Sequence, residues 1–559
     1  MGSQNESLLG GEFSSVYNQR IPKKKKSWIM FVFESLNFLL VGGLLFYVYS
    51  ETNASPVGKK YSHGPSKKNI IFMVTDGMGP ASLSLARSFK QQRDNLSIDD
   101  ILELDHHLIG SSRTRSSDSL ITDSAAGATA FACGLKSYNG AIGVNPDKIP
   151  CGTILEALKL QGYFTGLVVT TRITDATPAS FSAHVDSRSQ EDLIAEQQLG
   201  DSPLNRVVDL IIGGGRCHFL PPSIEGGCRA DERNLVEEAQ AQGWSYVESR
   251  TDFDYLQNGD NVTLPLLGLV AEKDIPYDID RNASQYPSLA EQAKVALTAL
   301  SKASEDSDQG FFLMIEGSRI DHAGHDNDPA AQVREVLAFD DAFKQVLEFI
   351  DETDTETIVI STSDHETGGL ATAKQVDPAY PQYLWYPEVL LNSTHSGEYL
   401  TKKILDYANK DDVQQFSDFI SKEILEKDMG ILDYTEEELS LVKNADKSNL
   451  SYALNNLISI RSQTGWSTHG HSAVDVNIYA YTNSKEIRKQ LLQGTANHGL
   501  LGNHENTEIG SFLERLTGVD LRNVTELIKD IRHAPSASEL AERSFEEGSL
   551  EKRHHLRDL

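Results

Sequence analysis

The chain has 559 residues, of which 39% are hydrophobic and 24% are charged, and its formal net charge is −30. This composition is typical of a folded globular protein, and the length allows one large domain or several ordinary ones. The acidic balance argues against nucleic acid as a partner, because a protein that binds a phosphate backbone needs a basic face.

An apolar run near the N-terminus predicts a membrane anchor. It extends from Trp28 to Tyr49, is interrupted only by Glu34 and Asn37, and follows four lysines at 23–26. A spanning helix needs about 20 mostly apolar residues, and positive charge stays on the cytoplasmic side. We therefore predict a single-pass type II protein with a cytosolic tail at 1–27, a transmembrane signal anchor at 28–50 and a lumenal body. A cleaved signal peptide or a buried helix are the alternatives; the 27 residues before the run favour the anchor.

Two further features agree with a lumenal body. Seven N-x-S/T sequons follow the anchor, which predicts a glycoprotein; they begin at Asn53, Asn95, Asn261, Asn282, Asn392, Asn449 and Asn523. The four cysteines also follow the anchor, and their order suggests loops closed by disulfides at 133–151 and 217–228, although three pairings are open.

The body has the rhythm of an α/β protein. Residues 51–68 are predicted to form a flexible stem, and short apolar runs then alternate with helical patterns. The runs lie at 69–75, 166–171, 207–212, 310–315, 357–362 and 474–481, and the helical patterns include 153–161, 289–301 and 329–350. This alternation predicts a three-layer sandwich with a central, mostly parallel sheet flanked by helices. Residues from about 372 to 466 lack this alternation and are predicted to be a surface insertion. Residues 534–559 are charged and predict a disordered tail. Proteolytic removal of that tail is a hypothesis.

Polar side chains follow four of the apolar runs. In open α/β sheets, ligands bind beyond the carboxyl ends of the strands. The candidates there are Asp76, Asp175, Thr177, Glu316, Asp321, His325, Asp364 and His365. Any one of them alone is more often a cap or turn residue, but four strand ends with carboxylates or histidines are hard to explain as caps. Mixed imidazole and carboxylate ligands suit zinc, and carboxylates with a hydroxyl suit magnesium.

A nucleophile is expected in the segment T-D-S-A-A-G-A-T-A at 122–130. Its small residues would allow a helix N-terminus to approach a phosphate closely, and the free N–H groups there favour an anion. A serine hydroxyl is a poor nucleophile until a base or a metal activates it, so Ser124 needs the predicted metal site. An ordinary helix start with Asp123 or Ser124 as N-cap is the alternative for this segment taken alone.

The motifs together resemble the alkaline phosphatase family. They are D-G-M-G (76–79), D-S-A-A-G-A-T-A (123–130), D-A-T-P (175–178), H-V-x-S-R (184–188), E-G-S-R-I-D-H-A-G-H (316–325) and T-S-D-H-E-T-G-G (362–369). They occur in the order of that family, and the resemblance spans Asn69 to Tyr481, which is most of the predicted lumenal body. We take 69–533 as the catalytic domain. The anchor, the tail and the layout are most similar to the fungal vacuolar, repressible members, which implies a vacuole membrane location and a homodimer.

The resemblance implies a role for each matching residue. Ser124 would be phosphorylated, Arg188 would bind the phosphate, and Asp123 would orient Arg188. Two zinc ions would be held by Asp76, Asp364 and His365 and by Asp321, His325 and a late histidine. The segment 468–481 contains His469 and His471, and the spacing back from Ala480 in the family's pattern implies His471 for that position. One magnesium ion would be held by Asp76, Asp175, Thr177 and Glu316. Asp175 matches bacterial members whereas His322 matches animal members, so the third site combines two patterns.

The predicted activity is hydrolysis of phosphate monoesters at neutral to alkaline pH through a phosphoserine, with a broad substrate range. A sulfatase would need a C/S-x-P-x-R context that Ser124 lacks. A phosphodiesterase of the same superfamily and a catalytically inactive lumenal binding protein are the remaining alternatives. Every matched position carries a residue competent for its role, which favours the phosphatase.

Overall fold

The computed structural model describes residues 67–529 and residue 531. The predicted cytosolic tail, the anchor, residues 51–66 of the stem and the C-terminal tail lie outside the described residues. Among the helices that are described, none combines the length and the apolar character needed to cross a membrane. The described residues belong to one compact unit.

A large sheet forms the centre of this unit, with its strands in the order β12-β2-β11-β8-β1-β7-β3-β4-β6-β5. β11 is antiparallel to both of its neighbours, β8 and β2, and all other neighbouring pairs are parallel. The predicted mostly parallel sheet is thereby confirmed. The strands are β1 (Lys68–Val74), β2 (Leu108–Arg113), β3 (Phe164–Arg172), β4 (Leu210–Gly214), β5 (Ser245–Val247), β6 (Leu266–Leu269), β7 (Phe311–Glu316), β8 (Glu356–Thr362), β11 (Val476–Thr482) and β12 (Gly502–Glu505).

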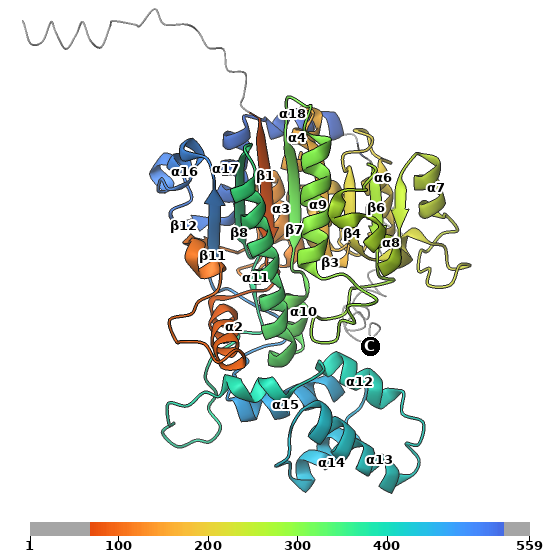
Figure 1. Ribbon diagram of the computed structural model, residues 1–559, viewed down its shortest axis with the longest axis vertical. Coiled ribbons are helices and arrows are strands. Elements are labelled where there is room, and N and C mark those ends of the chain that lie inside the picture. The colour runs from red at the N-terminus through yellow and green to blue at the C-terminus, as the bar shows by residue number, and fades with distance from the viewer. Residues whose placement is uncertain (1–66, 530, 532–559) are drawn as a thin grey trace, which may run out of the picture. The chain divides into compact units, whose positions relative to one another are not determined.

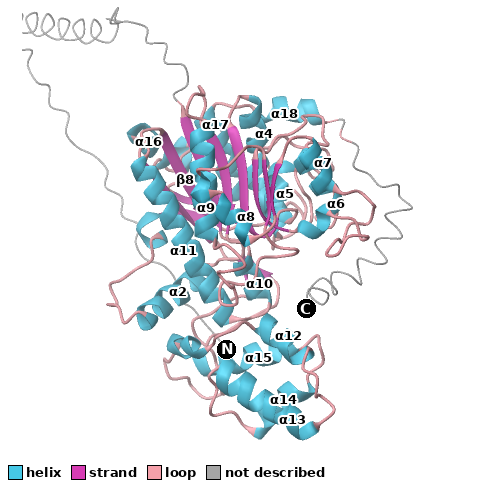
Figure 2. Ribbon diagram, turned by 45° about the vertical axis from the view of Figure 1, so that its right-hand side comes forward, coloured by secondary structure: helices cyan, strands magenta, loops and turns pink. Residues whose placement is uncertain are grey.

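Helices cover both faces of the sheet, as Figure 2 shows. In β1, Ile71 and Met73 pack into the layer that holds α2, α9 and α11, whereas Ile70, Phe72 and Val74 pack into the layer that holds α3, α4 and α17. Successive side chains of a strand point to opposite faces, so a strand buried on both faces has the continuous apolar run seen in the sequence. The helices of the two layers are α2 (Pro80–Arg93), α3 (Ser124–Cys133), α4 (Ile154–Leu160), α5 (Ala176–Ser182), α6 (Glu191–Leu199), α7 (Leu235–Ala241), α8 (Arg250–Tyr255), α9 (Leu289–Ala303), α11 (Pro329–Glu352), α16 (Lys485–Leu491), α17 (Asn506–Thr517) and α18 (Leu521–Ile528).

Local sequence signals fix where several of these helices begin. Thr153 and Glu156 form a capping box at α4, and Ser288 and Glu291 form another at α9, each with both reciprocal hydrogen bonds. Pro329 occupies the first turn of α11, where its missing N–H removes no helical hydrogen bond.

Residues 372–466, which we call the insertion, are mainly helical. In Figures 1 and 2 this segment lies on the side of α10 (Arg319–His325) that faces away from the sheet. Between 372 and 464 the structure has no strand; Gly465 alone forms a bridge, to Ala371. The elements of the insertion are the 3-10 helix η4 (Pro387–Asn392), α12 (Gly397–Leu405), α13 (Val413–Phe419), the π-helix η5 (Ile420–Asp428), α14 (Glu436–Asn444) and α15 (Leu450–Ser462).

One of the two suggested disulfides is present. Cys217 and Cys228 are bonded, with their Cα atoms 4.9 Å apart, which confirms that pairing. The suggested 133–151 pairing is wrong for this structure, because Cys133 and Cys151 are both free and buried. The Cys133 thiol lies 3.2 Å from the carbonyl oxygen of Cys151 and donates to it instead.

Candidate active site

The predicted site residues converge at the carboxyl ends of the central strands. Asp76 follows β1, Glu316 is the last residue of β7, and Asp364 and His365 follow β8. Asp175 is the N-cap of α5, which follows β3, and Thr177 lies in its first turn. Parallel strands place these ends at one edge of the sheet, which is where α/β proteins bind their ligands. Two further elements reach the same edge, namely the N-terminus of α3 and a small antiparallel pair of strands, β9 (Glu366–Thr367) and β10 (His471–Ser472).

Ser124 is the first residue of α3, and its side chain is buried. Asp123 is the N-cap: its Oδ1 accepts from Ala126 N at 2.9 Å, and its Oδ2 accepts from Gly140 N at 2.8 Å. Gly127 lies one turn further, where a Cβ atom would be 2.9 Å from Asp364 Cβ. The small residues of this segment therefore bring the start of α3 against the end of β8.

A first cluster of metal-ligand atoms surrounds the hydroxyl of Ser124. Ser124 Oγ is 3.1 Å from His365 Nε2, which is 3.3 Å from Asp364 Oδ2 and 3.6 Å from Asp76 Oδ1. The ligand atoms of Asp76, Asp364 and His365 all lie within 4.8 Å of one another. Asp76 Oδ1 and Asp364 Oδ2 are buried without a hydrogen-bond partner. Buried carboxylate oxygens without partners are costly, so this donor set fits a divalent cation.

The electrostatics of this cluster agree with a cation site. Burial and the neighbouring charge of Asp364 raise the pKa of Asp76 well above its usual value, and burial and Asp321 raise the pKa of Asp364 to about 7. Burial is the largest cause that lowers the pKa of His365 far below its usual value, and the charge of His471 is the next largest. The imidazole is therefore neutral at neutral pH, which is the form that binds metals.

A second cluster forms from Asp321, His325 and His471. Asp321 and His325 lie on the same face of α10, with His325 Nε2 3.3 Å from Asp321 Oδ2. His471 Nε2 is 3.1 Å from His325 Nε2 and 3.5 Å from Asp321 Oδ1. The ring of His471 also stacks on His365, with centroids 3.5 Å apart, so the two clusters are adjacent. Although burial opposes it, Asp321 raises the pKa of His325 to about 9.

Each of the three histidines directs its Nε2 atom into the site because its Nδ1 atom, on the other side of the ring, makes a hydrogen bond. The partner of His471 Nδ1 is the carbonyl oxygen of Thr122, at 2.8 Å, and that of His365 Nδ1 is Thr367 Oγ1, at 3.2 Å. His325 Nδ1 donates to the carbonyl oxygen of His469. Such partners fix the tautomer of a metal-binding histidine. His469 itself is exposed and turns its ring to the carbonyl oxygen of His325, so the geometry favours His471 as the ligand.

The residues predicted for the third metal include Asp76 of the first cluster, and the charges of Glu316 and Asp175 contribute to the raised pKa of Asp76. Burial raises the pKa of Glu316 to about 8, although the side-chain hydroxyls of Ser318 and Thr177 act in the opposite direction and lower this pKa. Ser318 Oγ donates to Glu316 Oε2 at 2.6 Å. His322 does not join this group by a hydrogen bond; its Nδ1 lies 3.8 Å from Asp274 Oδ2 and accepts from Arg319 Nε at 3.3 Å.

Arg188 lies at the edge of the site. Its Nη2 donates to Asp175 Oδ1 at 3.0 Å, and its Nη1 lies 3.5 Å from Asp123 Oδ2. The side chain is about one-third exposed. Two carboxylates therefore hold a planar donor group whose outer side remains open, which is the arrangement for bidentate binding of an oxyanion.

Sequence reasoning missed several residues of this site. Arg172, the last residue of β3, lies 3.4 Å from Asp175 Oδ2 and also pairs with Glu191 and Asp274. Thr367 donates to Asp321 Oδ1 as well as contacting His365. The sequence could have indicated Arg172, because it is a charged residue at the end of an apolar run. Nothing in the sequence indicated that Thr367 belongs to the site.

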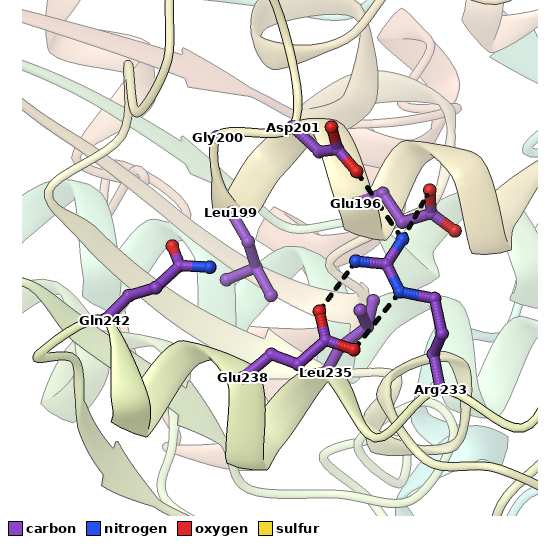
Figure 3. A pocket seen from close by; sticks show the side chains of 8 residues that line it. All are labelled: Glu196, Leu199, Gly200, Asp201, Arg233, Leu235, Glu238 and Gln242. Carbon is purple, nitrogen blue, oxygen red and sulfur yellow. Dashed lines mark hydrogen bonds and ion pairs between the residues drawn. The ribbon is translucent and has the colours of Figure 1, made fainter.

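A separate pocket of about 270 Å³ lies between α6 and α7 (Figure 3). None of the predicted site residues lines it. Its arginine, Arg233, is surrounded by Glu196, Asp201 and Glu238, as the dashed lines in Figure 3 show. These three carboxylates more than neutralise Arg233, so this pocket is not suited to a phosphate.

The fold and the site together define an α/β protein with clusters of candidate metal ligands at the carboxyl ends of its strands. The family model described as "Alkaline phosphatase" matches residues 67–519, so the chain belongs to the alkaline phosphatase family and is a phosphomonoester hydrolase. The chain is 58% identical over 557 residues to the repressible alkaline phosphatase of Saccharomyces cerevisiae, covering 96% of each chain. It is 48% identical over 484 residues to the alkaline phosphatase of Schizosaccharomyces pombe, covering 86% of this chain and 87% of the other.

Solved structures of alkaline phosphatases are similar to this structure in fold. The cold-active alkaline phosphatase of the psychrophile Shewanella sp. superposes with a TM-score of 0.66 at 31% identity, over 80% of this chain and 99% of the other. A variant of the TAB5 alkaline phosphatase, with Mg bound in its M3 site, superposes with a TM-score of 0.53 at 25% identity, over 82% of this chain and 99% of the other.

Proposed function

We propose that this protein hydrolyses phosphate monoesters at neutral to alkaline pH through a phosphoserine intermediate on Ser124, at a site for two zinc ions and one magnesium ion. The observation that carries the proposal is the position of Ser124, whose Oγ lies 3.1 Å from His365 Nε2 at the start of a helix that borders the metal-ligand clusters. The alternative of a plain helix start does not explain why the hydroxyl is buried among these ligands.

The types of donor atom support the following distribution of the metals. Asp76, Asp364 and His365 would hold one zinc ion, and Asp321, His325 and His471 the other. The magnesium ion would be held by Asp76, Asp175, Thr177 and Glu316, and the Mg bound in the M3 site of the TAB5 variant supports a third site. When bound, these ions supply the positive charge that lowers the pKa of a hydroxyl and stabilises oxygen atoms on both sides of an in-line displacement.

The side chains of the protein bind and orient the substrate. Arg188 would donate to two oxygens of the phosphate through its open side, while Asp123 and Asp175 keep its guanidinium in place. The N-terminus of α3 directs free N–H groups and a positive dipole to the same phosphate. Ser124 Oγ attacks phosphorus and the bond to the leaving oxygen breaks, so the alcohol departs. Water then attacks the phosphoserine, which releases inorganic phosphate and restores the hydroxyl.

The substrate range should be broad, because the side chains named above would contact the phosphate, and the leaving group would be contacted only at its oxygen. A phosphodiester has one more substituted oxygen, which removes a charge and an acceptor from the group that Arg188 would bind. We therefore expect a panel of diverse phosphomonoesters to be cleaved and diesters to be poor substrates. Cleavage of one monoester only, or faster cleavage of diesters, would contradict this.

The test of the proposal is hydrolysis of a chromogenic phosphomonoester by the purified full chain in detergent. Activity should be lost on chelation, return only when zinc and magnesium are both restored, and be abolished by Ser124→Ala. Ser202→Ala, which removes a surface hydroxyl in the loop after α6, should match the wild type. Acid quenching during turnover should leave phosphate on Ser124. A metal-replete native chain without activity would support the inactive binding protein instead.

The proposal also includes the membrane topology, the cellular location and the oligomeric state of the protein. The relative from Saccharomyces cerevisiae matches 96% of the chain, which supports a shared layout that includes the N-terminal region. We expect a type II membrane protein of the vacuole, with a cytosolic tail at 1–27, an anchor at 28–50, a stem at 51–68 and a lumenal, glycosylated catalytic domain at 69–533 that forms homodimers. Protease protection of residues after 50 in sealed vacuoles tests the topology, and light scattering of the purified chain tests the dimer.

A further inference from the structure

The helix α10 carries two residues of the second cluster, Asp321 and His325, and it consists of seven residues. A helix of this length has few internal hydrogen bonds, so packing with its neighbours determines where it lies. Part of that packing comes from the insertion, whose sequence lacks the alternation of strands and helices found in the rest of the chain.

At the first residue of α10, Arg319 reaches the insertion. Its side chain is 5% exposed, and its Nη2 donates to Glu398 Oε2 of α12 at 2.5 Å. The same guanidinium donates to the carbonyl oxygen of Ile275 at 3.2 Å and lies 3.7 Å from the ring centroid of Tyr277. Glu398 is thus the carboxylate partner of a buried arginine, and such a pairing is costly to break from one side only.

At the other end of α10 a second pair of contacts comes from the insertion. Asn455 of α15 is buried and donates from Nδ2 to the carbonyl oxygen of Asp326, the C-cap of α10, at 2.9 Å. Gly397 N, at the start of α12, donates to Asp328 Oδ2 at 2.7 Å. A Cβ atom on Gly397 would lie 2.2 Å from Asn455 Oδ1, so α12 and α15 meet at this point.

We propose that Glu398 and Asn455 are positioning residues for the second metal, and that the insertion is part of the metal centre rather than an independent surface module. Glu398 holds the start of α10 and Asn455 holds its end, so together they set where Asp321 and His325 present their ligand atoms. This inference rests on the function proposed above, because it concerns a metal held by those two residues.

A purely structural contribution of the insertion is the competing explanation, and the chain offers a matched control for it. Glu438 makes an ion pair with Arg461 inside the insertion, with both Oε1 and Oε2 at 3.0 Å from the guanidinium. Neither residue has a hydrogen bond or ion pair to α10 among the described contacts. Glu438→Gln therefore weakens the insertion as Glu398→Gln does, without releasing α10.

The experiment is zinc release from the full chain into an excess of a chromogenic chelator at 25 °C, with the melting temperature of each variant measured beside it. Direct partners of metal ligands change affinity by about 10- to 100-fold. Glu398 and Asn455 contact residues next to the ligands, so Glu398→Gln and Asn455→Asp should act at the lower end of that range and should each release one of two zinc ions about tenfold faster. The other zinc ion should leave at the wild-type rate. Glu398→Asp, which keeps the charge, should fall between Glu398→Gln and the wild type.

The outcomes separate the two proposals. If Glu398→Gln and Asn455→Asp release zinc no faster than Glu438→Gln, the positioning role is wrong, while the proposed function is unaffected. If both zinc ions leave faster in proportion to a lower melting temperature, the insertion stabilises the protein only, and the inference fails. A folded wild-type chain that binds no zinc would instead overturn the proposed function. The visible spectrum of the cobalt-substituted chain gives a second readout, which should change in Asn455→Asp and not in Glu438→Gln.

Discussion

Asp175 lies between two arginines: its Oδ1 accepts from Arg188 Nη2 at 3.0 Å, and its Oδ2 is 3.4 Å from Arg172 Nη2. Burial opposes the ionised form, but Arg172 and then Arg188 outweigh burial and hold the pKa of Asp175 well below its usual value. Arg172 is fixed in turn by Glu191 and Asp274. Arg188 is therefore connected through Asp175 and Arg172 to Glu191 and Asp274.

This network predicts that Arg172→Gln weakens substrate binding. Asp175 would lose one of its two cationic partners and could turn further toward Arg188, which closes the open side of that guanidinium. We expect KM for a phosphomonoester and Ki for inorganic phosphate to rise about tenfold, equivalent to about 1.4 kcal/mol, with a smaller change in kcat. Arg216→Gln, which removes hydrogen bonds to the carbonyl oxygens of Glu248 and Leu269, is the control. An unchanged Ki in Arg172→Gln would show that Arg172 does not act on Arg188.

The close approach of α3 to β8 predicts a strong effect of Gly127→Ala. The added methyl group would lie 2.9 Å from Asp364 Cβ and 3.4 Å from its carbonyl oxygen, so α3 or Asp364 must move. Overpacking of this kind costs about 1–3 kcal/mol, which exceeds the gain of about 1 kcal/mol from replacing glycine by alanine in a helix. We expect a lower melting temperature and a kcat/KM reduced by at least about tenfold, because Ser124 moves with α3.

The control for this variant is Gly494→Ala, where the nearest atom to the new methyl group is 3.9 Å away and φ is −75°. Its stability and kinetics should match those of the wild type. If Gly127→Ala retained full activity, the packing of α3 against Asp364 would not control the position of the nucleophile.

Much of the fold was predictable because its strands are buried on both faces. The runs at 69–75, 310–315 and 357–362 correspond to β1, β7 and β8, each within one residue at both ends. In the large sheet, the strands without a predicted counterpart are β2, β5, β6 and β12, which have three to six residues and include both edges of the sheet. The two-residue strands β9 and β10 had no predicted counterpart either. A three-residue strand such as Ser245–Val247 leaves no periodicity to detect.

The grouping of the candidate residues was predictable where residue type and strand end coincide, as at Asp76 and Asp364, which lie in one cluster. It was not predictable where long-range packing decides the role of a residue. His469 and His471 have the same residue type two positions apart, but their surroundings differ because β10 pairs with β9 and His471 stacks on His365. Likewise nothing local to Glu398 indicates that it is the partner of Arg319, 79 positions earlier.

Removal of the metals should destabilise the chain. A ligand that binds only the folded state stabilises it by about 2.7 kcal/mol at a free concentration of 100 times its Kd, for each site. We expect the melting temperature to fall on chelation and to return with zinc and magnesium. Ser124→Ala should show the same dependence, because its carboxylates and histidines are intact, whereas Asp364→Asn should show a smaller one. Equal melting temperatures with and without metal would contradict the metal sites.

The buried pair of His184 and Glu156 predicts how stability depends on pH away from the metals. His184 Nε2 lies 2.8 Å from Glu156 Oε1, its Nδ1 is 2.7 Å from the carbonyl oxygen of Gly143, and Cys151 is the other titratable group nearby. Burial lowers the pKa of His184, but Glu156 outweighs burial and raises it to about 9.

Because this pKa is above the unfolded value of about 6.5, the stabilisation is complete below pH 6.5 and is lost as the pH rises through 9. The shift corresponds to a loss on the order of 3 kcal/mol. Glu156→Gln removes the charge that raises the pKa and should be less stable than the wild type at pH 6, with the difference shrinking toward pH 10. Urea unfolding of the metal-free chains across this range measures it. A constant difference between the two chains would mean that His184 stays neutral in the folded protein, and that Glu156 acts only as the cap of α4.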